Sequence, residues 1–282
     1  MAKFRISGFS DEISADTTEQ FEALTRLGIE YFEPRGIDGK NISSLTDSEA
    51  YALKEKMDLY GIKASSIGSP IGKIKIEEDF EPHFELFKRT VKIAKILDTK
   101  YIRMFSFYVD GEWTDEKKAE VFKRLNTFIA YAKENGIILL HENEKGIYGD
   151  IGTRCAEIME TLACDNFRAV FDPANFVQCG EDTMVCFEAL TPYIGYMHVK
   201  DANLSDGKVV PAGQGDGNGA YITESLLKDG YDGFFSMEPH LGSFEGLANL
   251  EEDDKMMNLP KGGEGTFTLA YRYFKEILDK AE

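Results

Sequence analysis

The chain has 282 residues, of which 43% are hydrophobic, so it can form a sizeable core and is not a disordered polypeptide. A formal net charge of −18 would repel phosphate backbones and anionic lipid surfaces, so neither a nucleic acid nor a membrane is expected as a partner. The start of the chain is too polar for a signal peptide, no apolar run approaches the roughly 20 residues that cross a bilayer, and the four cysteines form no Cys-x-x-Cys pair, so we expect a cytoplasmic protein with reduced thiols.

Short apolar runs rich in β-branched and aromatic residues recur along the chain, and longer stretches with helical spacing lie between them. The eight predicted strands cover residues 4–9, 31–34, 63–67, 101–107, 137–140, 168–171, 195–199 and 233–237. The clearest amphipathic helices cover residues 17–28, 47–61, 81–97, 116–136, 153–162 and 267–282. Gly28, Gly61 and Gly136 each end a predicted helix just before a strand, as short αβ turns require.

This alternation predicts an α/β fold, a (β/α)8 barrel in a single domain that spans residues 1–282. An open doubly wound sheet usually has fewer strands for a chain of this length. The segment 243–263, which contains an acidic patch and a Gly-Gly pair, is predicted to be a surface loop that could cover the mouth of the barrel.

Polar side chains follow the last four predicted strands directly. Glu142, Asp172, His198 and Glu238 come after the apolar runs IILL, AVF, GYM and FFSM. In a barrel of this kind, residues at the carboxyl ends of the strands face the mouth, so these four should converge there. Three carboxylates would repel one another without a cation, and an oxygen-rich set suits Mn²⁺ best, with Mg²⁺, Co²⁺ or Zn²⁺ also acceptable.

Each of these residues also has an ordinary structural explanation. An aspartate at the end of a strand often caps the next helix, and a single histidine is often hydrogen-bonded in the core. The occurrence of four such residues on consecutive strands favours the metal site.

The same region resembles a known family. The motifs LLHENE, VFDPAN, YMHVKDA, VVPAGQGDGN and GYDGFFSMEPH, in this order over residues 139–240, are similar to those of the xylose isomerase-like barrel superfamily. This is the sugar phosphate isomerase/epimerase group, which includes ketose 3-epimerases, hydroxypyruvate isomerase, inositol-catabolism enzymes and endonuclease IV. The resemblance implies that the metal ligands are Glu142, Asp172, His198 and Glu238, in agreement with the argument from the strand ends.

The resemblance also implies a reaction. In the isomerases and epimerases of the group, the glutamates that match Glu142 and Glu238 act as the acid/base pair on opposite faces of a sugar bound to the metal. One carboxylate would remove the proton next to a metal-bound carbonyl, giving an enediolate, and the other or the same one would return it. Many members have a histidine where this chain has Asn175, and ketose 3-epimerases carry an arginine where it has Leu204, which weakens the narrower assignment as a 3-epimerase.

Further residues are candidates for contacts with a small sugar or polyol substrate. Arg35 could meet an anionic group or form a structural salt bridge, and Trp113 could stack on a sugar ring or shield the rim. Asn175 is a further candidate for substrate binding, and Lys200 and Asp201 could hold a substrate hydroxyl or carboxylate or form an ion pair within a solvated loop. The glycines at positions 213, 215 and 217 resemble a phosphate-binding loop, or they could simply allow a tight turn.

The alternatives differ in chemistry. Endonuclease IV needs a histidine-rich zinc cluster, and four histidines in a chain of charge −18 argue against it. A metal-dependent lyase or dehydratase acting on an inositol-like or glycoside substrate shares the first proton abstraction and stays open. A non-catalytic sugar-binding protein is disfavoured because both acid/base glutamates are present, and homo-oligomers are common in the family that the chain resembles.

Overall fold

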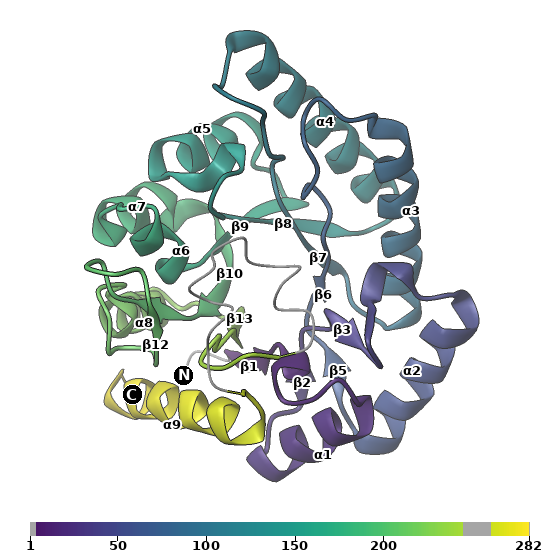
Figure 1. Cartoon of the computed structure of the whole chain (residues 1–282), viewed down its shortest axis with the longest axis vertical. Helices are drawn as coiled ribbons and strands as arrows, with labels where there is room; N and C mark the ends of the chain where they lie inside the picture. The colour runs from purple at the N-terminus through teal and green to yellow at the C-terminus, as the bar shows by residue number, and fades with distance from the viewer. Residues whose placement is uncertain (1–3, 245–260, 282) are drawn as a thin grey trace.

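Parallel strands form the centre of the protein, and the helices surround them (Figure 1). The computed structural model describes residues 4–244 and 261–281. Its strands are β1 (Arg5–Gly8), β2 (Tyr31–Phe32), β3 (Gly36–Ile37), β4 (Lys40–Asn41), β5 (Lys63–Ala64), β6 (Ile67–Gly68), β7 (Tyr101–Met104), β8 (Ile138–Glu142), β9 (Phe167–Phe171), β10 (Ile194–Val199), β11 (Asp201–Ala202), β12 (Val209–Val210) and β13 (Phe234–Met237).

The parallel strands close into a ring. A seven-stranded sheet has the order β1-β13-β10-β9-β8-β7-β6, and β2 pairs in parallel with β5, which continues after a short break into β6. The amide of Glu33 donates to the carbonyl of Gly8 at 2.9 Å, which joins the end of β2 to β1. The fold is therefore the predicted (β/α)8, or TIM, barrel, in which β5 and β6 together take the place of one strand.

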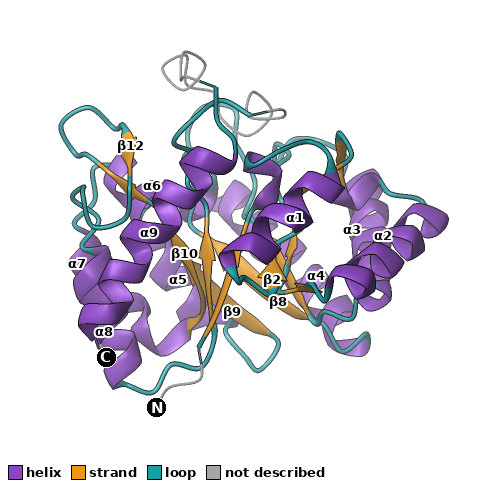
Figure 2. Cartoon of the chain, turned by 90° about the horizontal axis from the view of Figure 1, so that it is seen from below, coloured by secondary structure: helices purple, strands orange, loops and turns teal. Residues whose placement is uncertain are grey.

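The helices lie outside the strands (Figure 2). They are α1 (Thr17–Leu27), α2 (Asp47–Tyr60), α3 (Phe80–Ile96), α4 (Asp115–Glu134), α5 (Gly152–Leu162), α6 (Pro173–Gln178), α7 (Thr183–Leu190), α8 (Gly219–Lys228) and α9 (Glu264–Ala281). The clearest predicted helices correspond to α1 to α5 and α9, whereas α6, α7 and α8 were not singled out from the sequence. Among the described residues, none of the helices has the length and apolar character needed to span a membrane.

Local sequence explains where the helices begin and end. Thr46 caps α2 by accepting from the amide of Glu49, whose carboxylate accepts from the amide of Thr46 in return, so two amides that lack helical partners are satisfied. Gly61 ends the same helix at φ +69°, a conformation that glycine adopts without steric cost.

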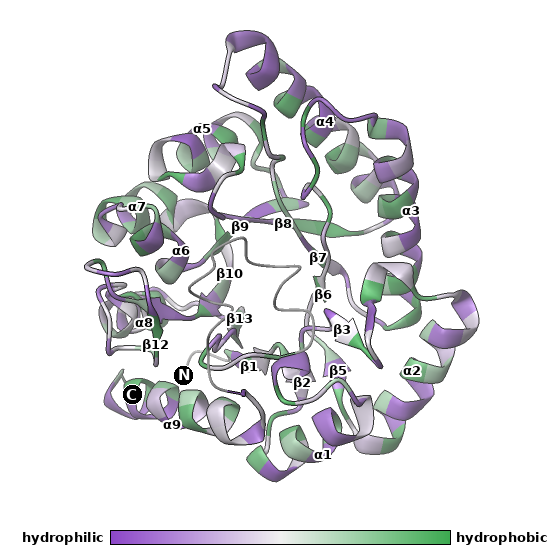
Figure 3. Ribbon diagram, in the orientation of Figure 1, coloured by the Kyte–Doolittle hydropathy of each residue, from purple (hydrophilic) through white to green (hydrophobic). Residues whose placement is uncertain are grey.

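Aromatic side chains fill much of the space between the strands and the helices. Phe128 of α4 packs on Phe87 of α3 with ring centroids 4.7 Å apart, and it stacks on Phe107 at 6.1 Å. All three side chains are fully buried. Hydrophobic and hydrophilic residues alternate along the outer helices (Figure 3), as expected for helices that bury one face against a barrel.

The loops at the carboxyl ends of the strands carry small additions that were not predicted. β3 pairs with β4 and β11 pairs with β12, both antiparallel, in the connections after β2 and β10. Of the predicted loop 243–263, residues 245–260 lie outside the described residues. Its described ends meet, because the amide of Gly262 donates to the carbonyl of Ser243 at 2.7 Å.

Candidate metal centre

Four side chains from neighbouring strands meet inside the mouth of the barrel. Glu142 ends β8, Asp172 directly follows β9, His198 lies near the end of β10, and Glu238 directly follows β13. Each residue offers one atom to a group in which all four atoms lie within 4.8 Å of one another, and all four residues are buried. The strand order β13-β10-β9-β8 explains the convergence, since strand ends that neighbour each other in the barrel share one rim.

The imidazole of His198 lies at the centre of this cluster. Its Nδ1 is 3.0 Å from Oε1 of Glu142, 3.5 Å from Oε2 of Glu238 and 3.7 Å from Oδ2 of Asp172. Opposite ligands of a divalent ion, with bonds of roughly 2.1 Å, lie about 4 Å apart. Small side-chain movements would therefore bring the four atoms around one cation.

Three buried side chains with positive charge contact the carboxylates of the cluster, two arginines on the outer oxygens of the glutamates and Lys200 on oxygens that face the cluster. Arg103 NH1 donates to Oε2 of Glu142 at 3.0 Å, and Arg35 NH1 donates to Oε1 of Glu238 at 2.9 Å. Lys200 Nζ lies 3.0 Å from both Asp172 Oδ2 and Glu238 Oε2. Glu142 and Glu238 thus each use one oxygen on an arginine and turn the other toward the cluster.

These charges keep the two glutamates ionised. Burial alone would raise the pKa of Glu142, but the charges of His198 and Arg103 outweigh it and lower the pKa to about 2. Burial also opposes ionisation of Glu238, yet the charges of Lys200 and the histidines hold its pKa well below the usual range. Both side chains are therefore carboxylates at neutral pH, which is the form that binds a metal or accepts a proton.

The chemistry of the donors fits a divalent cation. Oδ2 of Asp172 is fully buried and has no hydrogen bond among the described residues; its charged neighbours are Lys200 Nζ at 3.0 Å and His198 Nδ1 at 3.7 Å. A buried oxygen of this kind is costly in the protein interior unless positive charge lies beside it, and a divalent ion would supply more of that charge. Arg35 also pairs with Asp11 and Glu12, so its single positive charge is shared among three carboxylates. The carboxylates around the cluster therefore outnumber the arginines and the lysine. The cluster could hold a divalent metal ion.

Asp172 caps the next helix and also reaches the cluster. Its Oδ1 accepts the amide of Asn175 at 2.9 Å and caps α6, while its Oδ2 points into the cluster. Asn175 Nδ2 donates to the carbonyl of Asn143 at 2.9 Å and lies 3.3 Å from Oε1 of Glu142. The cap of the short helix α6 therefore fixes the orientation of the Asp172 carboxylate at the cluster.

The remaining predicted contact residues lie in different surroundings. Arg35 is 4% exposed and is held by Asp11, Glu12 and Glu238, and Lys200 is 5% exposed between two carboxylates of the cluster. Trp113 packs edge-on against Tyr148, with ring centroids 5.0 Å apart. The binding roles of Arg35, Trp113, Asn175 and Lys200 stay predictions.

The glycine-rich loop after β12 holds a carboxylate of this chain itself. Asp201 accepts the amides of Gly213 and Gly215 at 2.9 and 3.0 Å through Oδ2, and that of Gly217 at 2.8 Å through Oδ1. The loop that resembles a phosphate-binding loop is thus arranged around the Asp201 side chain.

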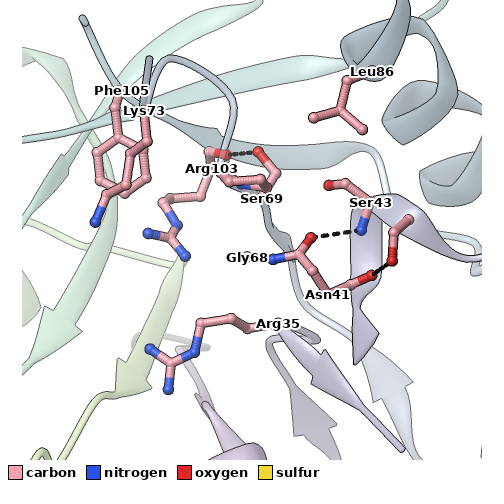
Figure 4. A pocket seen from close by; sticks show the side chains of 11 residues that line it. Arg35, Asn41, Ser43, Gly68, Ser69, Lys73, Leu86, Arg103 and Phe105 are labelled. Atoms are coloured by element: carbon pink, nitrogen blue, oxygen red, sulfur yellow. Dashed lines mark hydrogen bonds between the residues drawn. The ribbon is translucent and has the colours of Figure 1, made fainter. Parts of the chain in front are cut away.

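A cavity of about 380 Å³ lies beside the cluster, between the ends of β2, β6 and β7. It is lined by Arg35, Asn41, Ser43, Ser44, Gly68, Ser69, Pro70, Lys73, Leu86, Arg103 and Phe105. Figure 4 shows the charged ends of Arg35, Lys73 and Arg103 on one side of the view, and Asn41, Ser43 and Leu86 on the other. Since both arginines reach the cluster glutamates, the cavity adjoins the candidate metal centre.

Four charged residues of this region were not predicted from the sequence, namely Asp11, Glu12, Glu33 and Arg103. Asp11 and Glu12 lie three and four residues after the end of β1, in the short helix Ser10–Glu12, so a search of the loop after the first strand could have found them. Arg103 is an arginine inside the otherwise apolar strand β7, which is unusual enough to be a signal.

The comparisons with known proteins agree with this fold. Residues 21–258 match the family model described as xylose isomerase-like TIM barrel, so the chain belongs to this family. No curated protein sequence matches the chain.

Several solved structures share the fold at low sequence identity. The IOLI protein with a bound zinc atom is 18% identical, with a TM-score of 0.74 over 99% of both chains. A D-allulose 3-epimerase from Methylomonas sp. in complex with D-allulose is 15% identical, with a TM-score of 0.73 over 99% of this chain and 98% of that one. The probable 3-DHS dehydratase AsbF from Bacillus anthracis is 18% identical, with a TM-score of 0.69 over 83% of this chain and 92% of that one.

Proposed function

We propose that this chain is a divalent-metal-dependent isomerase or epimerase of a small sugar, keto-sugar or related polyol. The observation that carries the proposal is the pair of ionised glutamates, Glu142 and Glu238, at a buried cluster that could hold a metal. Glu142 comes from β8 and Glu238 from β13, on either side of His198. Two carboxylates close to one bound substrate can remove and return the proton next to its carbonyl.

Glu142, Asp172, His198 and Glu238 would hold the metal in this proposal. A divalent cation there would supply Lewis-acid polarisation of a substrate carbonyl and would offset the negative charge that develops on its oxygen. The oxygen-rich donor set favours Mn²⁺, with Mg²⁺, Co²⁺ and Zn²⁺ as alternatives. The zinc atom of the IOLI protein supports a divalent ion in this fold.

The two glutamates move the proton. One carboxylate accepts the proton from the carbon next to the carbonyl, and the other returns a proton, or the same one does. Arg103 and Arg35 fix the far oxygens of Glu142 and Glu238, so each carboxylate presents its inner oxygen in a defined direction. This fixed geometry reduces the entropy that must be lost to reach the transition state.

The cavity next to the cluster would receive the rest of the substrate. Its amide and hydroxyl side chains, Asn41, Ser43 and Ser69, are groups that pair with sugar hydroxyls, and Phe105 and Leu86 offer apolar surface. The D-allulose bound by the structural relative supports a sugar as the substrate class. Asn175 and Leu204 still argue against the narrower assignment as a ketose 3-epimerase.

Exchange of substrate hydrogen with solvent tests the proposal. The metal-supplemented protein is incubated in D₂O with Mn²⁺ and a panel of ketoses, and deuterium incorporation is measured by mass spectrometry. We expect exchange into at least one sugar and a loss of roughly 10²- to 10⁴-fold in Glu142→Gln and in Glu238→Gln. Glu157→Gln, whose carboxylate pairs with Lys118 on the outer helices, is the control and should keep the wild-type rate. If no sugar exchanges and Glu142→Gln changes nothing, the proposal is wrong.

A lyase or dehydratase is the second candidate, and the similarity to the probable dehydratase AsbF favours it. The first proton abstraction is the same, and the outcome depends on whether the substrate carries a leaving group on the β-carbon. The discriminating experiment adds inositol-like and glycoside ketones to the panel. A product that has lost water or an alcohol supports the lyase, whereas an isomer of equal mass supports the isomerase.

A further inference from the structure

Glu33 is a fully buried carboxylate beneath the candidate metal centre. It directly follows β2, with 0% of its surface exposed. Its Oε2 accepts from Tyr196 OH at 2.9 Å and from Ser236 Oγ at 2.7 Å. A fixed carboxylate inside a barrel is costly, so a role beyond packing is expected for it.

The same carboxylate faces the back of His198. Oε2 of Glu33 lies 3.4 Å from Nε2 of His198, while Nδ1 of that ring points at Glu142 on the opposite side. Among the described residues, neither Nε2 of His198 nor Oε1 of Glu33 has a hydrogen bond of good geometry. Nε2 of His198 is thus a buried nitrogen without a hydrogen bond, and the Glu33 carboxylate that faces it through Oε2 still has an oxygen, Oε1, that accepts none.

The contact between Glu33 and Nε2 of His198 bears on which nitrogen of the imidazole carries the proton. A neutral imidazole carries its proton on one nitrogen and a lone pair on the other. For Nδ1 of His198 to offer its lone pair to a cation, the proton must sit on Nε2. The group beside Nε2 then decides how firmly that tautomer and ring orientation are held.

We propose that Glu33 is a positioning residue for the metal centre: its carboxylate accepts the Nε2–H of His198 and thereby keeps Nδ1 directed at the cation site. The inference rests on the metal binding of the proposed function, but not on the reaction. Tyr196 and Ser236 hold the carboxylate in place from β10 and β13, so the contact is set by three different strands. Tyr196 is in turn held by Ser65, whose Oγ lies 2.8 Å from its hydroxyl.

Metal binding of the full-length protein tests the proposal. Mn²⁺ is titrated calorimetrically into metal-stripped wild type and Glu33→Gln, which removes the charge and keeps the size. We expect a dissociation constant raised by about 10- to 100-fold in Glu33→Gln. Ser7→Ala is the matched control, because Ser7 belongs to the same buried polar layer through Ser65 but its side chain has no hydrogen bond to Glu33 or His198. Its dissociation constant should stay within about threefold of wild type.

A second readout separates positioning from general destabilisation. In ¹⁵N-histidine spectra of the Zn²⁺-loaded protein, His198 of the wild type should show a single slowly exchanging Nε2–H, and Glu33→Gln should exchange this proton faster. Should Glu33→Gln fail to fold, Glu33→Asp decides, since the shorter carboxylate withdraws from the ring and should also weaken binding. Wild-type affinity and an unchanged spectrum in whichever variant folds overturn the proposal. If the wild type itself binds no divalent ion, the proposed function fails instead.

Discussion

The two halves of the barrel contribute different parts of the candidate metal centre. Strands β8, β9, β10 and β13 carry the four residues of the cluster, each at or near the carboxyl end of its strand. The first half carries the groups around the cluster, with Arg35 and Glu33 after β2 and Arg103 within β7. It also forms the cavity beside the cluster.

This difference shows what a sequence can reveal. The four cluster residues follow apolar runs directly, so each has a local signal, and the barrel rule places them together. Arg35 and Arg103 acquire their meaning only from partners far along the chain, at Glu238 and Glu142. The four cluster residues could therefore be interpreted from sequence, whereas the partners of Arg35 and Arg103 needed the structure.

Among substitutions in the first half of the barrel, the removal of a buried arginine should lower the free energy of unfolding most. Arg35→Met should lower the free energy of unfolding by about 5 kcal/mol and Arg103→Met by about 3 kcal/mol, because a buried carboxylate that loses its partner is strongly destabilising. Arg35 is expected to cost more since it faces Asp11, Glu12 and Glu238, whereas Arg103 pairs with Glu142 alone among the described residues.

Urea unfolding measures both effects, with Arg26→Met as the control. Arg26 makes two hydrogen bonds of 2.8 Å to Glu264, but its side chain is 53% exposed, so its loss should destabilise the protein far less than the loss of Arg35. Equal losses for Arg35 and Arg26 would show that the charges around Arg35 are not tied to it in the way described.

The strand and helix pattern of the barrel was largely predictable, and its deviations have local causes. The predicted strand 101–107 ends at Met104 because the next residues bond to another loop: the amide of Phe107 donates to the carbonyl of Gly72 at 2.9 Å. Phe107 adopts φ +71° there, and a pattern of apolar residues does not predict such a left-handed backbone conformation. Helix α6 was not singled out because it is only six residues long, too short for helical periodicity to stand out.

Of the candidate site, the sequence predicted the side chains that converge but not the way they are held. The arginines, Glu33 and the Asp201 loop depend on contacts between distant segments. The glycine-rich loop shows this best: its sequence fits a phosphate site, and only the three-dimensional contacts reveal the Asp201 carboxylate inside it.

The dependence of stability on pH tests the contribution of His83, which holds the loop beside the cavity in the first half of the barrel. His83 of α3 accepts the amide of Gly72 at 2.7 Å through Nε2, and burial lowers its pKa from 6.5 to about 4. The unfolded chain therefore binds a proton more readily, so the stability that the neutral ring contributes is complete above pH 6.5. This contribution is lost as the pH falls toward 4.

Comparison with His83→Gln isolates this contribution from the other histidines. Between pH 6.5 and 4, the wild type should lose up to about 3 kcal/mol more unfolding free energy than the variant, since one pKa unit corresponds to about 1.4 kcal/mol. Chemical denaturation at several pH values gives both curves. Parallel curves would mean that His83 titrates in the folded protein as it does in the unfolded one.

The smallest expected effect concerns the Asp201 loop of the second half. A Cβ on Gly217 would lie 2.7 Å from Oδ1 of Asp201, so Gly217→Ala forces the carboxylate or the loop to move and should cost about 1 to 3 kcal/mol. Gly219 begins α8 and has nothing within 4 Å of such a Cβ, so Gly219→Ala should be neutral or slightly stabilising. Thermal unfolding of the two variants gives the comparison. A tolerated Gly217→Ala would mean that the loop does not depend on Asp201, and the glycines would again be open to a phosphate.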